Sequence, residues 1–535
     1  MKKRLLGATA LTLIVGMTGA AHAEFKLNIL HINDFHSRFA PITSSDSNCS
    51  VEDDTAGKCF GGIARLKTEI DAKRQELTGE NVVLLDAGDQ FQGSLFYTQY
   101  RSQIVSEFAS DLGIDVMAVG NHEFDDGPEE LAKLIDAVKF PIISGNTNVT
   151  NEPILADKLK GTYVLDFGGE KVGVVSALAE DTGETSSPGK NVAFDDTIDS
   201  LRTQVEALQG TGITKIIALT HVGYTHDLEI AANVPGIDVI VGGHSHTLLS
   251  NTDEKAAGPY PTMVKGPDGH EVPVVTAYSY GKYLGDLAVT WDDAGNVVTA
   301  DGAPILLDAA VTPNQAYVDR LAELQKPIES LMAEVIGKAT AAIDGSRETC
   351  RVVECQMGNL VADAMLDRVA DQGVTIAIQN GGGVRASIDA GDITMGEVLT
   401  VLPFSNTLAT VTLSGADVID ALENGVSDIE NGAGRFPQVA GLKYSYTLAK
   451  PAGERISDVM IKAEGDAWAP IDEAASYIVV TNNYMRGGGD GYGTFAEGDN
   501  PYDFGPPLEQ VLADYIAKLG GEYTPYTDGR ITVLQ

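Results

Sequence analysis

The chain has 535 residues, of which 43% are hydrophobic and 7% aromatic, and its formal charge is −39. This length is too great for one ordinary core, so we expect two globular domains. The strongly acidic surface argues against nucleic acid and anionic lipid as partners, and an anionic small molecule would need a local positive site to bind.

The N-terminus is typical of a secretory signal peptide. Three basic residues at positions 2–4 precede an apolar run that ends at Met17, and a small-residue cleavage site ends at Ala23. We therefore expect residues 1–23 to be removed and the mature protein to be periplasmic or secreted. The apolar run is short for a bilayer span, and no later segment or C-terminal signal indicates a membrane anchor.

Four cysteines fall into two close pairs, Cys49 with Cys59 and Cys350 with Cys355. In an oxidising compartment each pair is expected to form a local disulfide, and a thiolate metal site is the alternative. Each bridge would close a short loop, so it would fix the shape of that loop more than it stabilises the whole fold.

Short apolar runs alternate with helical patterns from Leu27 to about Val289, which indicates an α/β layer domain. Helices are expected at Ile63–Leu77 and Pro128–Val138. The expected strands are Leu27–Ile32, Val82–Asp86, Val116–Val119, Pro141–Ser144, Val172–Ser176, Ile216–Leu219 and Val239–Val241.

The pattern changes near Thr312 and Pro313, which are expected to cap and open a long helix that Pro327 should kink. We expect an interdomain helix at residues 312–337, between a first domain of residues 24–311 and a second α/β domain of residues 338–535. In the second domain the pattern predicts a helix around Met357–Val369 and strands around Ile376, Leu408–Leu413 and Tyr477–Val480.

Polar side chains follow five strands of the first domain, at the point where each strand ends. Ligand sites in open α/β sheets form at the carboxyl ends of strands, so these side chains can share one crevice. Asp, Asn and His suit borderline divalent ions, and seven such ligands suffice for two metals. The seven candidates are Asp34, His36, Asp89, Asn121, His221, His244 and His246.

The motifs of the first domain, taken in chain order, resemble those of the calcineurin-like metallophosphoesterase family. The matching motifs are Asp34-x-His36, Gly88-Asp89, Gly120-Asn121-His122-Glu123, His221 and Gly243-His244-x-His246. The resemblance implies a sandwich of two mixed sheets flanked by helices. It also implies the ligand sets, with one metal on Asp34, His36 and His246, the other on Asn121, His221 and His244, and Asp89 as the bridge.

Two metals about 3.5 to 4 Å apart polarise phosphoryl oxygens and lower the pKa of a bound water until hydroxide, the expected nucleophile, is available near neutral pH. His122 directly follows the ligand Asn121, and it would donate a hydrogen bond to the phosphoryl or leaving oxygens on which negative charge develops. Asp125 would favour the protonated form of His122, as in the dyad of that family. The alternative is that His122 only supports the ligands. The ligand types accept zinc, manganese or cobalt.

The second domain combines arginines, glycine loops and aromatic residues. Glycine loops allow close backbone approach, arginines bind phosphate through bidentate hydrogen bonds, and two aromatic rings could sandwich a base. The candidates are Arg347, Arg351, Asn380, Gly383, Arg385, Phe404, Tyr484 and Asp490.

Together these motifs resemble the C-terminal domain of 5′-nucleotidases, with the strongest likeness to ecto-5′-nucleotidases, and both cysteine pairs match that group. The resemblance implies that Phe404 and Tyr484 stack on the base, although Tyr484 departs from the phenylalanine common there. It implies further contacts: Arg351 and Arg385 with the phosphate end, Asn380 with the base and Asp490 with the ribose. Arg347 is matched in periplasmic UDP-sugar hydrolases.

The sequence therefore predicts a secreted two-metal phosphoesterase that hydrolyses nucleoside 5′-monophosphates. Alternatives with the same fold are a UDP-sugar or nucleoside di- or triphosphate hydrolase, a 2′,3′-cyclic phosphodiesterase with 3′-nucleotidase activity, and a thiosulfohydrolase. A binding protein without turnover is a further alternative, against which the complete ligand set argues. Because metals and base pocket lie on different domains, the substrate must bridge them, and hinge motion near the interdomain helix is expected. The sequence leaves the oligomeric state open.

Overall fold

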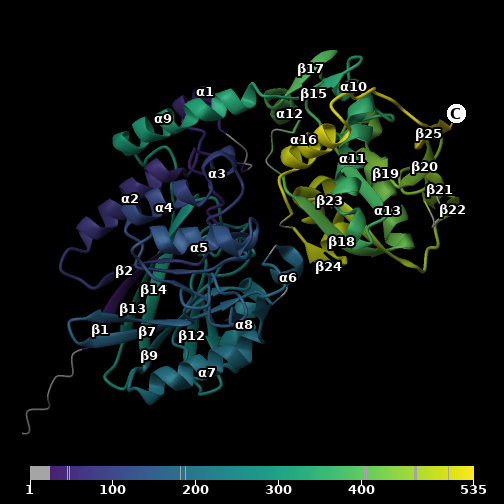
Figure 1. Cartoon of the computed structure of the whole chain (residues 1–535). Helices are drawn as coiled ribbons and strands as arrows, with labels where there is room; N and C mark the ends of the chain where they lie inside the picture. Colours follow the sequence, from purple (N-terminus) through teal and green to yellow (C-terminus); the bar gives the residue numbers. More distant parts are fainter. Residues whose placement is uncertain are drawn as a thin grey trace, which may run out of the picture.

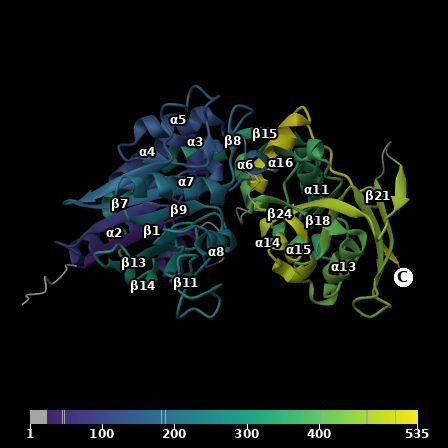
Figure 2. The ribbon, with the colours of Figure 1, turned by 90° about the horizontal axis from the view of Figure 1, so that it is seen from below.

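Two lobes make up the molecule, and the chain passes between them at the end of a long helix (Figure 1). After a rotation of 90° the lobes still lie side by side (Figure 2). The computed structural model describes residues 24–534, apart from residues 45, 47, 48, 181, 187, 403, 405, 463–466 and 504. The predicted signal peptide, residues 1–23, lies outside the described residues.

Two six-stranded mixed sheets form the centre of the first lobe, with strand orders β14-β13-β1-β2-β3-β4 and β11-β12-β10-β9-β7-β6. Strands β1 to β4 run parallel, as do β7, β9, β10 and β12, while the other strands pair antiparallel at the edges. The first sheet comprises β1 (Phe25–Ile32), β2 (Val82–Asp86), β3 (Val116–Ala118), β4 (Ile142–Ile143), β13 (Tyr283–Trp291) and β14 (Val297–Leu306). The second comprises β6 (Thr162–Phe167), β7 (Glu170–Leu178), β9 (Lys215–His221), β10 (Val239–Val241), β11 (Thr262–Lys265) and β12 (Glu271–Val275).

Apolar side chains fill the space between these sheets. Leu27 and Val83 of one sheet and Val174 and Leu219 of the other belong to the same buried cluster. Burying one such side chain stabilises the fold by about 1.5–3 kcal/mol. Helices cover the outer faces, α2 (Ile63–Glu76), α4 (Ser102–Leu112) and α5 (Pro128–Ala137) on the first sheet, and α7 (Thr197–Gly210) and α8 (Tyr224–Asn233) on the second. The predicted sandwich of two mixed sheets flanked by helices is confirmed.

The long helix α9 (Gln315–Met332) is shorter than the predicted range of residues 312–337. It begins later because Asn314, not Thr312, caps it, with its side-chain oxygen accepting the N–H groups of Ala316 and Tyr317. The last residues of the predicted helix belong instead to strand β15 (Val335–Ala339). Because Leu324 and Ile328 pack into the core of the first lobe, α9 is part of that lobe, and the crossing to the second lobe follows Met332.

A five-stranded mixed sheet of order β19-β16-β23-β18-β24 forms the centre of the second lobe. Its strands are β16 (Ile376–Asn380), β18 (Leu408–Ser414), β19 (Pro437–Ala440), β23 (Ser476–Asn482) and β24 (Asp499–Tyr502). Helices α11 (Gln356–Arg368), α12 (Met395–Val401) and α16 (Leu508–Lys518) pack in one hydrophobic cluster with it, and α13 (Gly415–Gly425) in another. The second cluster also includes a four-stranded sheet of β20 (Leu442–Thr447), β21 (Ile456–Lys462), β22 (Trp468–Pro470) and β25 (Ile531–Leu534). The predicted second α/β domain is thus present.

Short elements connect these layers. They are α1 (Val51–Thr55), α3 (Leu95–Tyr100), α6 (Thr182–Thr185), α10 (Arg347–Cys350), α14 (Asn483–Arg486), α15 (Gly493–Ala496), β5 (Thr147–Asn148), β8 (Ala193–Phe194) and β17 (Gly391–Thr394). Short 3₁₀ turns lie at Asn121–Phe124, Ala370–Gln372, Gly381–Gly383, Ile429–Asn431 and Gly489–Gly491. Within residues 24–534 as described, helices that combine the length and the apolar character needed to cross a bilayer are absent.

Two disulfides are present, and they join the pairs that the sequence predicts. The Cα atoms of Cys49 and Cys59 are 6.1 Å apart, and those of Cys350 and Cys355 are 5.0 Å apart. The second bridge closes the turn between α10 and α11. It therefore fixes the loop that carries Arg351.

Candidate metal centre and substrate pocket

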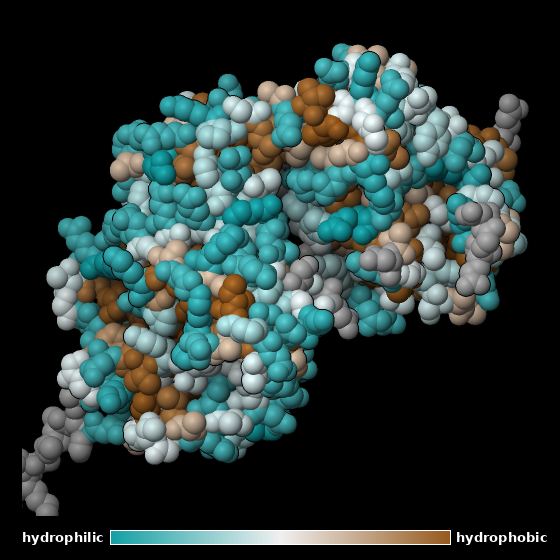
Figure 3. Space-filling model, in the orientation of Figure 1, coloured by the Kyte–Doolittle hydropathy of each residue, from teal (hydrophilic) through white to brown (hydrophobic). Residues whose placement is uncertain are grey.

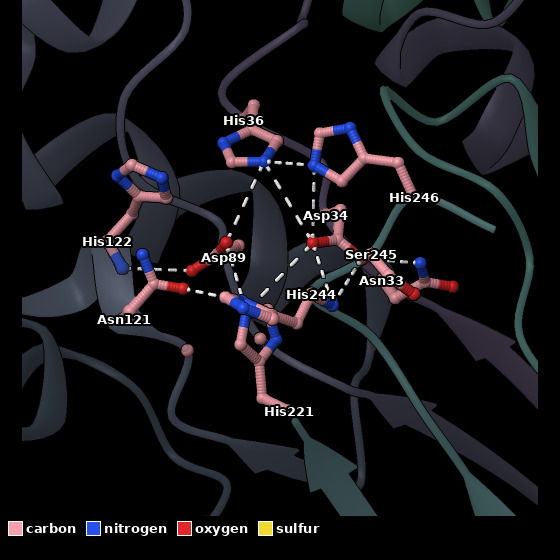
Figure 4. Close-up of polar contacts among 12 residues, drawn as sticks. Asn33, Asp34, His36, Asp89, Asn121, His122, His221, His244, Ser245 and His246 are labelled. Carbon is pink, nitrogen blue, oxygen red and sulfur yellow. Dashed lines mark hydrogen bonds and ion pairs between the residues drawn. The ribbon is translucent and has the colours of Figure 1, made fainter. Parts of the chain in front are cut away.

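The seven predicted metal ligands meet at the carboxyl ends of strands from both sheets of the first lobe (Figure 4). Because β1, β2 and β3 belong to one sheet and β9 and β10 to the other, the crevice lies across the open edge of the sandwich. Asp34 and His36 follow β1, Asp89 follows β2, Asn121 follows β3, His221 ends β9, and His244 and His246 follow β10.

The ligand atoms form two adjoining groups. In one, Nε2 of His246 lies 3.5 Å and Nε2 of His36 lies 4.0 Å from Oδ1 of Asp34. In the other, Nε2 of His221 lies 3.0 Å from Oδ2 of Asp89, and the ligand atoms of Asp89, His221 and His244 all lie within 4.8 Å of one another. Asp89 also lies 3.7 Å from Nε2 of His36, so it reaches both groups.

The donor atoms fit cations. Nε2 of His36 and Nε2 of His246 face each other at 2.9 Å (Figure 4). Within the described part of the chain, neither Oδ2 of Asp89 nor Nε2 of His221 has a hydrogen bond of proper geometry, although both are buried. Buried polar atoms are normally satisfied, and ions account for exceptions of this kind. This set of residues is therefore suited to hold divalent metal ions.

The charge states of two of the imidazoles agree with that fit. Burial lowers the pKa of His244 and of His246 to about 3, so both rings are neutral and offer a lone pair. Burial would also lower the pKa of His221, but the charges of Asp89 and Asp34 outweigh it and raise that pKa to about 10. The space between these two carboxylates thus attracts positive charge.

Five of the seven ligand positions have a left-handed backbone, with φ of 49° at Asp34, 48° at His36, 58° at Asp89, 81° at His244 and 49° at His246. Such a conformation costs a non-glycine residue roughly 1–3 kcal/mol and persists only where the surroundings enforce it. The sharp turns after the strands therefore serve to aim side chains inward rather than to stabilise the chain.

Glu123 ties together two loops that carry predicted ligands. Its Oε2 accepts the backbone N–H groups of Gly120 at 2.7 Å and Asp89 at 3.0 Å, and its Oε1 accepts those of Gln90 at 2.8 Å and Phe91 at 3.2 Å. The loops come this close only at bare backbone, since a Cβ atom on Gly120 would lie 2.2 Å from Oδ1 of Asp89. The sequence motif includes Glu123, but its role becomes visible only in the structure.

The predicted dyad lies beside the metal ligands. Nδ1 of His122 is 2.6 Å from Oδ2 of Asp125, whose Oδ1 accepts a hydrogen bond from Ser186. Burial would lower the pKa of His122, but the charges of Asp125 and Asp89 outweigh it and raise the pKa to about 9. The His122 ring is therefore protonated at neutral pH, and its centroid lies 5.2 Å from that of the His36 ring.

A cavity of about 130 Å³ in front of the ligands is shared by both lobes. His36, His122 and His246 line it from the first lobe, together with Arg38 and Tyr280, which the sequence analysis missed. The Arg38 guanidinium lies 5.1 Å above the Tyr280 ring. The second lobe contributes Thr407, Asn483, Asp503, Gly505 and Pro507. Figure 3 shows the two lobes meeting along a largely hydrophilic seam.

A separate cavity of about 340 Å³ lies in the second lobe. Seven of the eight predicted substrate residues line it: Arg351, Asn380, Gly383, Arg385, Phe404, Tyr484 and Asp490. The exception is Arg347, which is exposed and lies outside the lining, with its guanidinium 3.5 Å from the Gly432 carbonyl that Arg351 also contacts at 3.2 Å. Asn406 and Gly434 also line the cavity, and no sequence signal marked either one.

Positive charge gathers at one end of this cavity. Burial and the neighbouring charges of Arg347 and Arg385 lower the pKa of Arg351. Arg385 in turn lies over the Phe404 ring, 5.4 Å from its centroid. An anion bound here would relieve the repulsion among the guanidinium groups, and phosphate matches their geometry.

Two cavities of complementary character thus lie next to each other, one shared by both lobes at the metal-ligand crevice and one within the second lobe. The wall between them includes the consecutive residues Asn406 and Thr407 and the consecutive residues Asn483 and Tyr484, one of each pair lining each cavity. The metal centre could activate a phosphoryl group, and the second cavity could hold an anionic group and an aromatic ring. A ligand that uses both would have to pass from one lobe to the other.

Known proteins share this arrangement. Residues 27–248 match the calcineurin-like phosphoesterase family, and residues 335–497 match the C-terminal domain of 5′-nucleotidases. The human 5′-nucleotidase is 37% identical over 98% of this chain and 94% of its own length. The fold and the crevice thus define the class, a calcineurin-like phosphoesterase with a second domain of the 5′-nucleotidase C-terminal type.

Solved structures agree. The 5′-nucleotidase precursor of Thermus thermophilus is 40% identical, with a TM-score of 0.61 over 96% of this chain and 100% of that one. The NAD nucleotidase of Haemophilus influenzae is 28% identical, with a TM-score of 0.78 over the same shares. The chain belongs to the 5′-nucleotidase family, and it is a phosphoric monoester hydrolase.

Proposed function

We propose that the protein hydrolyses nucleoside 5′-monophosphates to nucleoside and orthophosphate. The observation that carries this proposal is the pairing of an Asp/Asn/His crevice on one lobe with an arginine and aromatic cavity on the other. A metal-binding crevice alone would suit any phosphate ester. The second cavity adds recognition of a base, because stacking a base on an aromatic ring contributes roughly 1–3 kcal/mol.

Two divalent ions, of zinc, manganese or cobalt, belong in the crevice in this proposal. Asp34, His36 and His246 would hold one ion, Asn121, His221 and His244 the other, and Asp89 would bridge them. Such a pair supplies Lewis acidity and an activated water at neutral pH. The support from this chain is the grouping of ligand atoms and the buried oxygen of Asp89 that faces both groups.

His122 is proposed to donate a proton or hydrogen bond to an oxygen of the phosphoryl group or to the leaving oxygen. Its position supports this role, because the ring lines the cavity in front of the ligands and the Asp125 carboxylate keeps it protonated. In-line displacement at phosphorus places charge on these oxygens, so a cationic donor there lowers the barrier. Asp125 in turn orients the ring.

The substrate is proposed to bind first through the second lobe. Arg351 and Arg385 would hold the phosphate end of the substrate. Phe404 and Tyr484 would sandwich the base, which Asn380 would also contact. Asp490 would contact the ribose, and Gly383 would allow close approach of the backbone. Arg347 would add charge at the margin. Because the two cavities have no lining residue in common among those that the structure describes, we further propose that the lobes rotate about the segment that follows α9 to bring the phosphate to the metal centre.

Nucleotides with a longer phosphate chain are the second candidate substrates. The three neighbouring guanidinium groups of Arg347, Arg351 and Arg385 favour them, since one phosphate neutralises only part of this charge. The Haemophilus influenzae structure is a NAD nucleotidase, which is consistent with such a substrate. A periplasmic or extracellular location is proposed for either activity, supported by the two disulfides.

Phosphate release by metal-stripped enzyme tests both candidates. The enzyme would be reconstituted with zinc, manganese or cobalt and given AMP, UDP-glucose, ADP, a 2′,3′-cyclic nucleotide and p-nitrophenyl phosphate. We expect the highest kcat/KM with the 5′-monophosphate and no turnover before metal is restored. Higher kcat/KM with UDP-glucose or ADP would favour the second candidate, and equal rates with p-nitrophenyl phosphate would remove the role proposed for the second lobe.

A further inference from the structure

Tyr484 and Asp490 form a closed pair of hydrogen bonds at the wall of the second cavity. The Tyr484 hydroxyl donates to Oδ1 of Asp490 at 3.0 Å and accepts the backbone N–H of Asp490 at 3.1 Å. The other oxygen of the carboxylate, Oδ2, accepts the side-chain amide of Asn380 at 2.7 Å. The carboxylate is therefore held from two sides, and its plane is fixed.

The backbone around Asp490 is shaped for this contact. Asp490 has a left-handed φ of 55°, and its carbonyl accepts the amide of Asn424 at 3.2 Å. The Tyr484 ring lies against Gly489, where a Cβ atom would be 2.5 Å from ring carbons. Only glycine at that position lets the ring lie across the loop. The ring, its hydroxyl and the carboxylate are thus positioned as one unit.

This unit leaves the carboxylate able to accept more hydrogen bonds. An ionised carboxylate has about four acceptor positions, and the bonds from Tyr484 and Asn380 use one on each oxygen. Two acceptors side by side match two hydroxyl groups on neighbouring carbons, such as the 2′- and 3′-hydroxyls of ribose. A 2′-deoxyribose offers only one of them, so one acceptor would lose its water without gaining a partner.

We propose that Tyr484 is a positioning residue for ribose, which acts through Asp490 and makes the enzyme select ribonucleotides over 2′-deoxyribonucleotides. This inference rests on the proposed nucleotidase function and deepens it by giving the Tyr484 hydroxyl a part in the recognition of the ribose. The aromatic ring and the hydroxyl then have separate tasks. The half-exposed ring offers its face to a base, and the hydroxyl fixes the carboxylate beside it. A phenylalanine at this position could stack but could not hold Asp490.

The test compares AMP with 2′-deoxy-AMP in wild type, Tyr484→Phe and Tyr477→Phe. Tyr477 is the matched control, since it lies in the same lobe and, among the described residues, its hydroxyl bonds only the backbone of Asp472. We expect wild type to prefer AMP by about 10- to 100-fold in kcat/KM, because a hydrogen bond to a charged group contributes that much. Tyr484→Phe should reduce the preference about tenfold, through a KM that rises more for AMP than for 2′-deoxy-AMP.

An unchanged preference in Tyr484→Phe, or an equal loss with both substrates, would overturn the inference. Calorimetric binding of adenosine and 2′-deoxyadenosine separates this failure from failure of the proposed function, because it needs no turnover. If wild type releases no phosphate yet binds adenosine more tightly and Tyr484→Phe loses that difference, the nucleotidase proposal fails and the ribose site stands. If neither nucleoside binds, or both bind equally in wild type, the ribose site fails.

Discussion

Nδ1 of His122 lies 2.6 Å from Oδ2 of Asp125, so a buried imidazole and a partly buried carboxylate share one hydrogen bond at the rim of the predicted metal-binding crevice. The backbone N–H of His122 meanwhile donates to Oδ1 of Asp89 at 2.9 Å. His122 thus contacts both Asp125, through its ring, and Asp89, through its backbone N–H. The pH behaviour of the enzyme should therefore depend on Asp125.

We expect Asp125→Asn to shift the alkaline limb of the kcat profile to lower pH. In the proposed mechanism the active form has His122 protonated, and the His122 pKa of about 9 predicts that kcat falls as the pH rises through about 9. The Asp125 charge opposes the effect of burial most strongly, so its removal should lower the pKa of His122, and a nearby opposite charge is typically worth about 1–3 pKa units. The protonated fraction, and with it kcat, should then be lost at a lower pH.

The control for this experiment is Asp126→Asn. Asp126 is the neighbouring carboxylate, but it pairs with Arg101 and Tyr97 instead of His122. Its removal should leave the alkaline limb in place. The same limb in Asp125→Asn as in wild type would show that Asp125 does not set the charge of the ring.

We expect Asp89→Ala to reduce kcat/KM at least about 10³-fold, because loss of a bridging ligand removes several kcal/mol of charge stabilisation. Treatment of wild type with a chelator should have the same effect, and added metal should restore wild type only. Asp115→Asn is a control, since its partly buried carboxylate accepts the backbone N–H of Leu84 and Asp115 precedes β3, at the end of that strand away from the crevice. Chelator-resistant phosphate release would contradict a metal mechanism.

A third prediction concerns Glu123, whose carboxylate accepts four backbone N–H groups of the two ligand loops. In Glu123→Gln an NH₂ group would face two of these donors, so the loops should separate and metal affinity should fall about 10- to 100-fold. Titration of metal into the apo protein measures this directly. Glu130→Gln also removes a buried carboxylate, one that holds the start of α4 through Ser102, and should leave metal affinity unchanged. If both variants bound metal as tightly as wild type, Glu123 would have no effect on metal affinity.

The fold was predictable where a strand is long enough to have its own apolar pattern. Strands β2 and β10 have the predicted bounds, whereas the predicted strand Pro141–Ser144 is reduced to Ile142–Ile143. The start of α9 was not predictable in the same way, because Thr312 and Asn314 are both good helix caps. The choice falls to Asn314 because its N–H bonds the carbonyl of Ala64 and Tyr317 packs into the core of the first lobe.

The grouping of the seven predicted ligands was predictable because each lies at or just after the end of an apolar strand, and parallel strands bring their ends together. Arg38 and Tyr280 gave no such signal. Tyr280 lies in the loop before β13, and β13 pairs with β1. The N–H of Tyr280 bonds the carbonyl of Asp34, and this contact brings Tyr280 to the crevice. Contacts between residues this far apart in the sequence depend on the finished fold, and no local pattern encodes them.

The last prediction separates the arginines of the second lobe. We expect Arg351→Ala to raise KM for AMP about 10- to 100-fold, since charge-assisted hydrogen bonds contribute about 1.5–3 kcal/mol. Competitive inhibition by adenosine should be unchanged, because a nucleoside has no phosphate for Arg351 to hold. Arg347→Ala should change KM for AMP less than about threefold, because Arg347 is exposed and lies outside the cavity lining, and exposed charge pairs contribute about 0–1 kcal/mol. If Arg347→Ala instead weakens the binding of UDP-glucose or ADP much more than that of AMP, the third guanidinium group binds a second phosphate. If Arg351→Ala weakens the binding of adenosine as much as that of AMP, Arg351 shapes the cavity instead of binding phosphate.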